Sequence, residues 1–422
     1  MRRIGHALGR TPLLKGLPAE VAVVTAVAFC VALGFGILAP AIPVFARTFG
    51  VSAMAASSVI SVFALVRFIS SPAAGAMVNR FSERSVLSTG LIIVSVSSLA
   101  AGFSQNFTQL LILRGIGGLG STMFTVSALS LLLRTVSADQ RGRATSAYQG
   151  GFLFGGIAGP LVGGLIVAFS IRAPFFVYSV TLGIAAIVTL VFLSPSRLRE
   201  KEDVVSGGES KELETLGAAL RHPAYRAAIS VNFITGFASF GLRMAIVPLF
   251  VTEGLQRGAT WSGIGFLIAA AVQAVLLLPA GRMADTQGRR KALIIGSIAL
   301  AVGMLVISIS DLAANVLGTA SVIGLALFLV ALAIQGAGSA FLSSAPAAVV
   351  GDIVGGKRGG IVVSTFQMTS DLGLVIGPLI AGLLVDLLDF DWAFIAATAL
   401  CLVSLLLVVA MPETLKKKAT PA

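Results

Sequence analysis

The sequence predicts an all-α membrane protein in which twelve transmembrane helices form two six-helix bundles related by pseudo-two-fold symmetry. Of its 422 residues, 56% are hydrophobic and 11% are charged, whereas soluble domains carry about 25% charged residues. Apolar runs of about 20 residues, the length that spans a hydrocarbon core of about 30 Å, recur from end to end. The two halves of the chain also repeat short motifs in the same order.

The apolar runs define the predicted spans. The first run has no small-residue cleavage pattern behind it, so we interpret it as a retained span and not as a signal peptide. The tenth run is longer than a span requires, so we expect it to include a loop or a kinked end. The predicted spans are residues 21–44, 53–77, 85–104, 108–134, 142–169, 173–193, 226–250, 260–281, 290–310, 316–350, 359–386 and 392–411.

Basic residues are distributed unequally over the two sides of this arrangement. Of the 30 lysines and arginines, 24 fall on the side that holds both termini, three fall on the other side, and three lie inside spans. The positive-inside rule therefore predicts a plasma-membrane protein with both termini cytoplasmic. Because the net charge of +12 then reflects topology and lipid contact, we expect no nucleic-acid partner.

Residue types that bind metals or carry out catalysis are scarce. The two cysteines, Cys30 and Cys401, lie in apolar helices, and the two histidines, His6 and His222, lie in predicted cytoplasmic segments. No GxxxxGK[ST] phosphate-binding motif occurs. We therefore expect no metal site, no cofactor and no enzymatic activity.

The polar segment 194–225 divides the chain into two sets of six spans. We predict that it is a flexible linker with one short amphipathic helix near residues 211–220. The predicted organisation is a cytoplasmic N-terminal segment (1–20), an N-terminal bundle (21–193), the linker (194–225), a C-terminal bundle (226–411) and a cytoplasmic tail (412–422).

The two predicted bundles share sequence motifs. "GPLVGG" at 159–164 matches "GPLIAG" at 377–382, and "GAMVNRFSERSVL" at 75–87 matches "GRMADTQGRRKAL" at 281–293. Several matches in one order indicate an internal duplication.

Four motifs together carry a resemblance to a known family. They are "LGFGILAPAIP" (33–43), "RGIGGLG" (114–120), "GGIAGPLVGG" (155–164) and "GRMADTQGRRKAL" (281–293). With these motifs in this order, the chain resembles the major facilitator superfamily, and more closely its twelve-span drug/proton antiporter branch. The resemblance implies alternating access, with the proton gradient as the energy source and a substrate site between the two bundles.

Glycines four residues apart form a bare stripe on the fifth predicted span, which allows another helix to pack backbone to backbone. The stripe consists of Gly151, Gly155, Gly159 and Gly163. Pro160 is tolerated there because the residue four positions earlier is Gly156. The resemblance implies that Gly377, Pro378 and Gly382 of the other half lie opposite, and that the contact is a seam that bends and slides. The alternative is close packing without a moving role.

The loop motif of the second half places Asp285 near Arg289 and Arg290. An acid here can cap a helix or pair with arginine across a cytoplasmic gate, and the resemblance implies that it steadies the outward-open state. The alternative is a surface loop that follows the positive-inside rule. In the first half, Asn79 stands where the aspartate is expected, so we expect the gate to depend on the second half.

An acid at membrane depth is costly, so it faces a cavity or a partner. Asp371 is the one acid deep inside a predicted span, whereas Asp311, Asp389 and Asp391 are expected at the outer surface. We predict that Asp371 binds and releases the transported proton, and the alternative is a fixed pair with a buried arginine. Antiporters that resemble this chain often carry an acid in the first or fourth span, and this chain has none there.

Three arginines, Arg67, Arg114 and Arg243, lie inside predicted spans. The resemblance implies that Arg114 assists proton exchange with a carboxylate; the alternative is a structural partner of backbone carbonyls. Three cations against one acid indicate either a cavity that attracts anionic or amphipathic substrates or arginines that extend to the membrane surface and are not deep.

Further mid-span side chains are candidates to line the substrate cavity, although each type is more common as a helix–helix contact. They are Tyr148, Gln149, Asn232, Gln335, Gln367, Phe29, Phe35, Phe233, Phe237 and Phe240.

These features together predict a monomeric secondary transporter that exports small hydrophobic or amphipathic compounds in exchange for protons, as in multidrug efflux. One alternative keeps the fold and changes the cargo to a lipid, a glycolipid or an anionic metabolite. A membrane-embedded enzyme or receptor is a further alternative, but the sequence lacks a convergent set of nucleophile, base or metal ligands.

Overall fold

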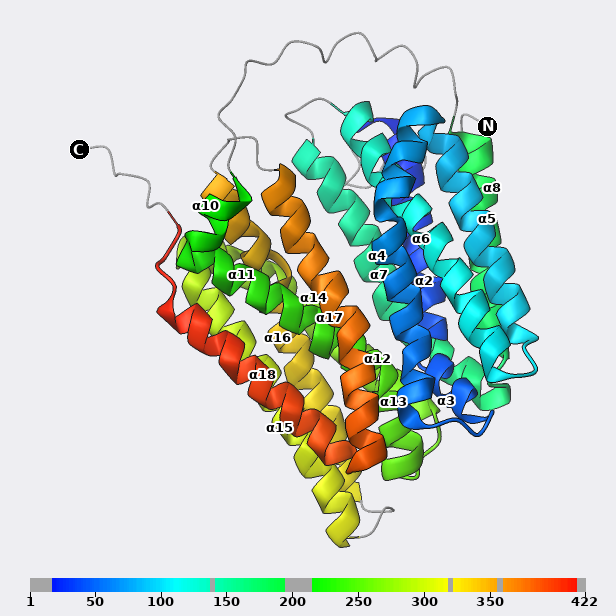
Figure 1. Cartoon of the computed structure of the whole chain (residues 1–422), viewed down its shortest axis with the longest axis vertical. Coiled ribbons are helices and arrows are strands. Elements are labelled where there is room, and N and C mark those ends of the chain that lie inside the picture. The colour runs from blue at the N-terminus through cyan, green and yellow to red at the C-terminus, as the bar shows by residue number, and fades with distance from the viewer. Residues whose placement is uncertain (1–16, 137–140, 194–214, 318–321, 355–359, 416–422) are drawn as a thin grey trace. The chain divides into compact units, whose positions relative to one another are not determined.

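The computed structural model describes residues 17–136, 141–193, 215–317, 322–354 and 360–415, and the regular elements within these ranges are helices. Twelve helical stretches in these residues are long and apolar enough to cross a membrane, which confirms the predicted number of spans (Figure 1).

The chain divides into two compact units. The first unit comprises residues 1–51 and 62–209, and the second comprises residues 52–61 and 210–422. The helices of the first unit are α2 (Ala19–Leu38), α3 (Ala41–Arg47), α4 (Ala53–Arg80), α5 (Glu83–Gly102), α6 (Phe107–Thr135), α7 (Arg141–Phe169) and α8 (Ala173–Phe192), with the first turns of α4 assigned to the second unit.

The second unit contains both α-helical and π-helical segments. They are α10 (Leu216–Arg221), α11 (Pro223–Ile234), η2 (Thr235–Leu242), α12 (Arg243–Ala245), α13 (Val247–Leu249), η3 (Phe250–Gly254), α14 (Thr260–Thr286), α15 (Arg289–Leu317), α16 (Val322–Val354), α17 (Gly360–Leu387) and α18 (Phe390–Ala410).

Three predicted spans differ from the observed helices. The first span is interrupted at Ala39–Pro40, because proline has no N–H to continue the helical hydrogen bonding. The tenth span begins at Val322 and continues through Pro346 to Val354, whereas residues 316 and 317 belong to α15. Part of the extra length predicted for the tenth span, residues 316 and 317, is therefore the end of the preceding helix, α15.

The seventh span is the least regular. Its first twelve residues form α11, and two π-helical segments, η2 and η3, follow on either side of the short helices α12 and α13. Pro248, in α13, lacks a backbone donor, and Gly236 and Gly241 lie within η2. The sequence predicted one regular helix over residues 226–250 and missed these π-helical segments. Such turns often occur at functional sites.

Side-chain caps explain several helix boundaries. Ser82 accepts a hydrogen bond from Ser85 N at the start of α5, and Asn106 accepts one from Gln109 N at the start of α6. Thr215 caps α10, which is the observed part of the amphipathic helix predicted near 211–220; residues 211–214 lie outside the described ranges.

Aromatic side chains fill the core of the second unit around Phe250, which is fully buried. Its ring centroid lies 5.7 Å from Phe390, 5.4 Å from Phe394 and 6.3 Å from Phe328. These contacts join the end of the seventh span to α16 and α18, and α15 runs beside both of these helices (Figure 1).

The first turns of α4 belong to the second unit because Asp386 caps them. The two carboxylate oxygens of Asp386, on α17, accept hydrogen bonds from Ala53 N at 2.8 Å and Met54 N at 2.9 Å. A carboxylate at this position satisfies free N–H groups and lies at the positive end of the helix dipole. Gly382 completes the contact, because a Cβ there would lie 2.6 Å from Met54 Cα.

Candidate functional site

The interior of the first unit contains a buried arginine, Arg114 on α6. Its side chain is 2% exposed, and its guanidinium carbon lies 4.5 Å from the ring centroid of Phe63 on α4. Within the described part of the chain, its Nε and Nη1 have no hydrogen-bond partner. The sequence therefore placed Arg114 correctly inside the membrane span, and two of its three guanidinium nitrogens have no acceptor among the described residues.

Two tyrosines lie within electrostatic range of the arginines of this unit. Tyr178, on α8, interacts electrostatically with both Arg114 and Arg67, and Tyr148, on α7, interacts with Arg67. Tyr148 is buried, and its hydroxyl has no hydrogen-bond partner among the described residues. Of the predicted cavity residues, Arg67 and Tyr148 are thus linked to Arg114 through these electrostatic interactions.

The glycines that follow Arg114 bring α4 close to α6. A Cβ at Gly118 would lie 2.5 Å from the carbonyl oxygen of Phe63, so only glycine fits. The hydroxyl of Thr122 donates to the carbonyl of Arg67 at 3.0 Å, and Ser70 donates to Thr122 at 3.2 Å. This contact holds Phe63 and Arg67 beside the guanidinium.

The glycine stripe of α7 packs directly on α2. A Cβ on any of the four glycines would lie 2.5 to 2.6 Å from a carbonyl oxygen of α2. The four oxygens belong to Thr25, Phe29, Leu33 and Ile37. The expected close approach of two backbones is confirmed, but the expected partner is wrong, because α2 of the same unit covers this face and not the Gly377 region. A moving role for the stripe stays a prediction.

The second unit contains the same contact. A Cβ at Gly377 would lie 2.6 Å from the carbonyl oxygen of Phe237 in η2, and a Cβ at Gly241 would lie 2.9 Å from Pro378 Cδ. In the first unit, a Cβ at Gly36 would lie at the same 2.9 Å from Pro160 Cδ. Each unit therefore packs the proline-containing helix of its repeat against the first helix of that repeat.

Asp371, the predicted proton carrier, lies half-buried on α17. The helix around it is fixed to the seventh span, because the amide nitrogen of Asn232 donates to the carbonyl of Phe366 at 2.6 Å and contacts Thr369 Oγ1 at 3.4 Å. Arg243 starts α12, and its Nη1 is buried without a hydrogen-bond partner among the described residues. Both groups lie in the second unit.

The remaining predicted cavity residues occupy different environments. Gln335 is fully buried between α16 and α15, where its amide contacts the sulfur of Met304, so the structure does not place it on an accessible surface. Phe237 is buried beside Phe233, and Phe35 packs edge-on against Tyr178. The exposed members are Gln149, Gln367, Phe29 and Phe240.

Asp311 is a buried acid that the sequence analysis misplaced. We expected an outer-surface residue, but its side chain, on α15, is 2% exposed, and its Oδ2 has no hydrogen-bond partner within the described residues. Gly254 covers it, since a Cβ there would lie 3.4 Å from Asp311 Oδ1. Only the packing of the seventh span over α15 reveals this burial, so no signal near residue 311 predicts it.

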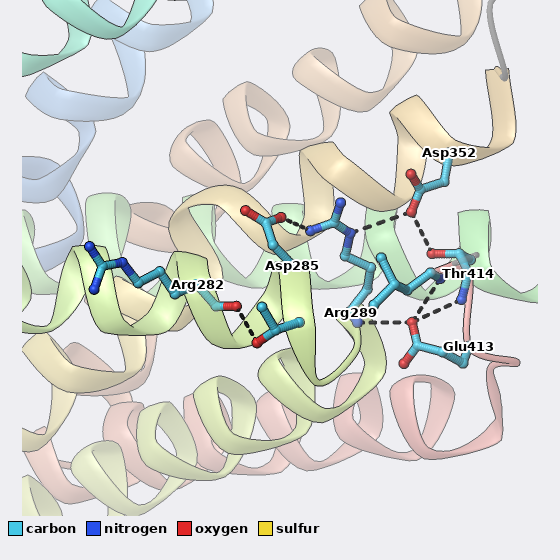
Figure 2. Close-up of polar contacts among 8 residues, drawn as sticks. Arg282, Asp285, Arg289, Asp352, Glu413 and Thr414 are labelled. Atoms are coloured by element: carbon cyan, nitrogen blue, oxygen red, sulfur yellow. Dashed lines mark hydrogen bonds and ion pairs between the residues drawn. The ribbon is translucent and has the colours of Figure 1, made fainter. Parts of the chain in front are cut away.

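A polar cluster lies where α14 ends and α15 begins, and Figure 2 shows its members. We call it the Arg289 cluster; it consists of Asp285, Arg289, Asp352, Glu413 and Thr414. Arg289 forms ion pairs with Asp285 and, at 3.4 Å, with Asp352, and Thr414 donates to Asp352 at 2.9 Å. The predicted proximity of Asp285 and Arg289 is confirmed, and its role as a gate stays a prediction.

The segment after α18 completes this cluster. The carboxylate of Glu413 accepts hydrogen bonds from Arg289 N at 2.8 Å and Arg290 N at 3.1 Å, the first two residues of α15. Gly288 precedes them at φ +122°, and Glu413 Oε2 lies where its Cβ would be. The sequence motif therefore needs glycine at this position for two reasons, conformation and space.

The first-half loop is built differently. Ser82 caps α5, and Glu83 is buried and accepts a hydrogen bond from Ser130 at 3.4 Å. Asn79 belongs to α4, but its side chain lies outside what the structure describes. Within the described residues, the pairing of aspartate with arginine in this motif occurs in the second half.

The Glu413 carboxyl has a lowered pKa. Partial removal from water raises the pKa, but four backbone N–H groups outweigh this effect and hold the pKa of Glu413 below its ordinary 4.5. These donors belong to Leu415, Arg289, Arg290 and Thr414. Because the folded protein binds the proton less tightly than the unfolded chain, the stabilisation is present above pH 4.5 and is lost as the pH falls through the lowered pKa.

The glycine stripe predicts an effect confined to one face of α7. Gly155→Leu should lower the free energy of unfolding by at least about 1–3 kcal/mol, because its Cβ would lie 2.5 Å from the carbonyl oxygen of Phe29. Gly156→Leu is the matched control, since nothing lies within 4 Å of a Cβ there. Thermal unfolding of the purified variants measures both, and equal stability of the two would contradict this packing.

The Glu413 cap predicts a pH-dependent stability. Glu413→Ala should lower the free energy of unfolding by about 1 kcal/mol at pH 7, the usual effect of removing a helix cap. Glu413→Gln keeps an acceptor oxygen without the charge, so it should retain part of the stability. Unfolding measured from pH 7 to pH 3 should show the difference between wild type and Glu413→Ala shrinking below pH 4.5; a constant difference would refute the role of the charge.

Within the described residues, no group of three or more histidine, cysteine, aspartate or glutamate side chains is placed to hold a metal ion. The polar side chains inside the described parts of the units are guanidiniums, phenols, hydroxyls, amides and carboxyls. Among these carboxyls, Glu83 and Asp311 are buried and Asp371 is half-buried.

The chain is similar in sequence to a known family and to known proteins. The model of the Major Facilitator Superfamily matches residues 24–271 and 228–422. Multidrug resistance protein 2 of Bacillus subtilis (strain 168) is 26% identical over 384 residues, which are 89% of this chain and 91% of that protein. Multidrug resistance protein 1 of the same organism is 26% identical over 402 residues, 93% of this chain and 96% of that protein.

A solved structure shares the fold. The crystal structure of a bacterial homolog of the human lysosomal transporter Spinster, in an inward-facing and occupied conformation, superposes with a TM-score of 0.72. The match covers 92% of this chain and 95% of that chain at 16% sequence identity, so it shows the fold alone.

Proposed function

The chain belongs to the Major Facilitator Superfamily, and from that membership we propose that it exports small hydrophobic or amphipathic compounds across the plasma membrane in exchange for protons. As a member of a transporter family with the corresponding fold, it is a multi-pass membrane transporter and not an enzyme. The observation that carries the proposed cargo is the similarity, along about nine-tenths of the chain, to two multidrug resistance proteins.

Alternating access is supported by the repeated internal architecture. Each unit packs a proline-containing helix on the first helix of its repeat, which makes each unit a stiff body. Stiff repeats that move as units are the general basis of alternating access in such transporters. The excess of basic residues on one side supports a topology with both termini in the cytoplasm, and the proposed transporter works as a monomer.

The Arg289 cluster is the proposed gate element of the second unit. It ties the ends of α14, α15 and α16 to the segment after α18 through charged groups at the helix ends (Figure 2). Ion pairs at helix ends are readily broken and reformed, because each exposed pair contributes little stability. The cluster therefore suits an element that must release in one state of the cycle.

Proton coupling is assigned to Asp371. A carboxylic acid inside a span can take up a proton when its cavity opens to one side of the membrane and release it on the other. Its helix, α17, is held by Asn232 and by the contact of Gly377 with Phe237, so the carboxyl has a defined position relative to the seventh span.

Asp371→Asn should abolish uphill transport driven by a proton gradient while leaving downhill transport intact, because the amide cannot carry a proton. The measurement is uptake of ethidium, a neutral steroid and laurate by proteoliposomes with an imposed pH gradient. Asp386→Asn is the matched control, since it makes the same change on the same helix and keeps an acceptor oxygen for the first turn of α4.

Two outcomes of this assay would overturn the proposal. If Asp371→Asn still concentrates substrate with the proton gradient as the sole driving force, Asp371 is not the proton carrier. If the wild-type protein concentrates no member of the panel under either direction of the gradient, proton-coupled export of such compounds is refuted.

A further inference from the structure

The cluster around Arg114 carries positive charge that the described acids of the first unit do not neutralise. We call it the Arg114 cluster, and it consists of Arg67, Arg114, Tyr148, Tyr178 and the ring of Phe63. The described acids of this unit, Glu20 and Glu83, lie in the first turns of α2 and α5. Within the described part of the unit, no carboxylate therefore lies at mid-span to balance the two arginines.

The groups already present leave two of the three guanidinium nitrogens of Arg114 without an acceptor. Phe63 covers a face of the guanidinium at 4.5 Å, but a stacked ring accepts none of the in-plane N–H bonds. Within the described residues, Nε and Nη1 of Arg114 and the hydroxyl of Tyr148 have no partner. A buried charge without a partner is costly, so its retention points to a ligand.

The geometry of the free donors defines the ligand's chemistry. Adjacent N–H groups of a guanidinium match the two oxygens of a carboxylate or phosphate, and the Tyr148 hydroxyl supplies a third donor. Arg67 is half-buried, lies one helical turn after Phe63 on α4 and interacts with Tyr178 as Arg114 does, so it adds a second positive charge to the cluster. Two cations in one place repel a cationic group.

The surroundings of the cluster are apolar. Tyr148 packs edge-on against Phe152, with ring centroids 5.1 Å apart, and Phe152 contacts Phe124 at 6.2 Å. Phe35 packs against Tyr178 at 6.5 Å. These rings offer a hydrocarbon chain dispersion contacts on both sides of the charged centre.

We propose that the Arg114 cluster binds the anionic head group, a carboxylate or a phosphate, of an amphipathic substrate whose apolar part lies against the phenylalanines. This proposal rests on the proposed function, since it names the substrate class of the same transporter. Arg114 holds the oxygens, Arg67 adds charge, and Tyr148 donates the third hydrogen bond.

Equilibrium binding tests the proposal. The purified full chain is placed in nanodiscs of phosphatidylcholine, and binding of radiolabelled laurate is measured with unlabelled competitors of equal chain length. Dodecyl phosphate should displace laurate, whereas dodecanamide and dodecylamine should compete at least tenfold more weakly. Equal competition by dodecanamide would overturn the proposal, because the head-group charge would then contribute nothing.

Variants locate the site. Arg114→Gln should weaken laurate binding at least tenfold, Arg114→Lys should restore part of it, and Tyr148→Phe should weaken it by about threefold. Arg172→Gln is the matched control: Arg172 also stacks on a phenylalanine, Phe45, in this unit, but its guanidinium already donates to a backbone carbonyl. Unchanged binding in folded Arg114→Gln would overturn the assignment.

If Arg114→Gln does not fold, the proposal is tested with Arg67→Gln and Tyr148→Phe. Laurate binding by both variants as strong as that of the wild type would overturn it. A second set of nanodiscs containing phosphatidylglycerol distinguishes the source of the anion. Reduced laurate binding there identifies a lipid phosphate as the ligand, and unchanged binding identifies a free carboxylate; both support an anion site.

The binding assay uses no gradient, so the two proposals fail separately. Selective laurate binding without proton-driven uptake refutes proton-coupled export and keeps the anion site. Proton-driven uptake of ethidium without any preference for laurate over dodecanamide refutes the anion site and keeps the exporter.

Discussion

Backbone-to-backbone packing of glycine-bearing helices is the constraint on which the architecture of each unit depends. In lipid, no hydrophobic effect drives one apolar helix against another, so close van der Waals contact must hold them. The stripe on α7 achieves this contact because α2 carbonyl oxygens occupy the space of four missing Cβ atoms. The same contact sets the distance between α7 and α2. Tyr148 lies on α7, and Phe35, whose ring contacts that of Tyr178, lies on α2.

The second unit repeats this contact with a different backbone. Its first span is π-helical where it meets α17, and Gly236 lies against Ser370 so closely that no side chain fits. A π-helical turn shifts the register of the following residues relative to an α-helix. The two repeats thus share a packing rule and differ at Arg243, which follows η2 directly. This difference accompanies the different side chains of the two proposals, Asp371 in the second unit and Arg67 with Arg114 in the first.

The sequence was sufficient for features that depend on local spacing. Hydropathy located twelve spans, because each span is one continuous apolar segment. Glycines four residues apart predicted a bare helix face, and the spacing of Asp285 and Arg289 predicted an ion pair within one turn. The spacing of residues on one helix does not determine which other helix packs against it, so the predicted partner of the glycine stripe was wrong. For the same reason the burial of Asp311 under Gly254 and the contact of Glu413 with Arg289, which are distant in sequence, required the folded structure.

The cap that Glu413 provides for α15 has a consequence for biosynthesis. A chain is made from its N-terminus, so α15 leaves the ribosome well before the residues that follow α18. Until those residues arrive, the first two N–H groups of α15 lack their carboxylate, and the loop carrying Gly288 has no fixed partner. The segment after α18 therefore completes the start of a helix synthesised more than a hundred residues earlier, and termination before Glu413 would leave that helix start without its cap during membrane insertion.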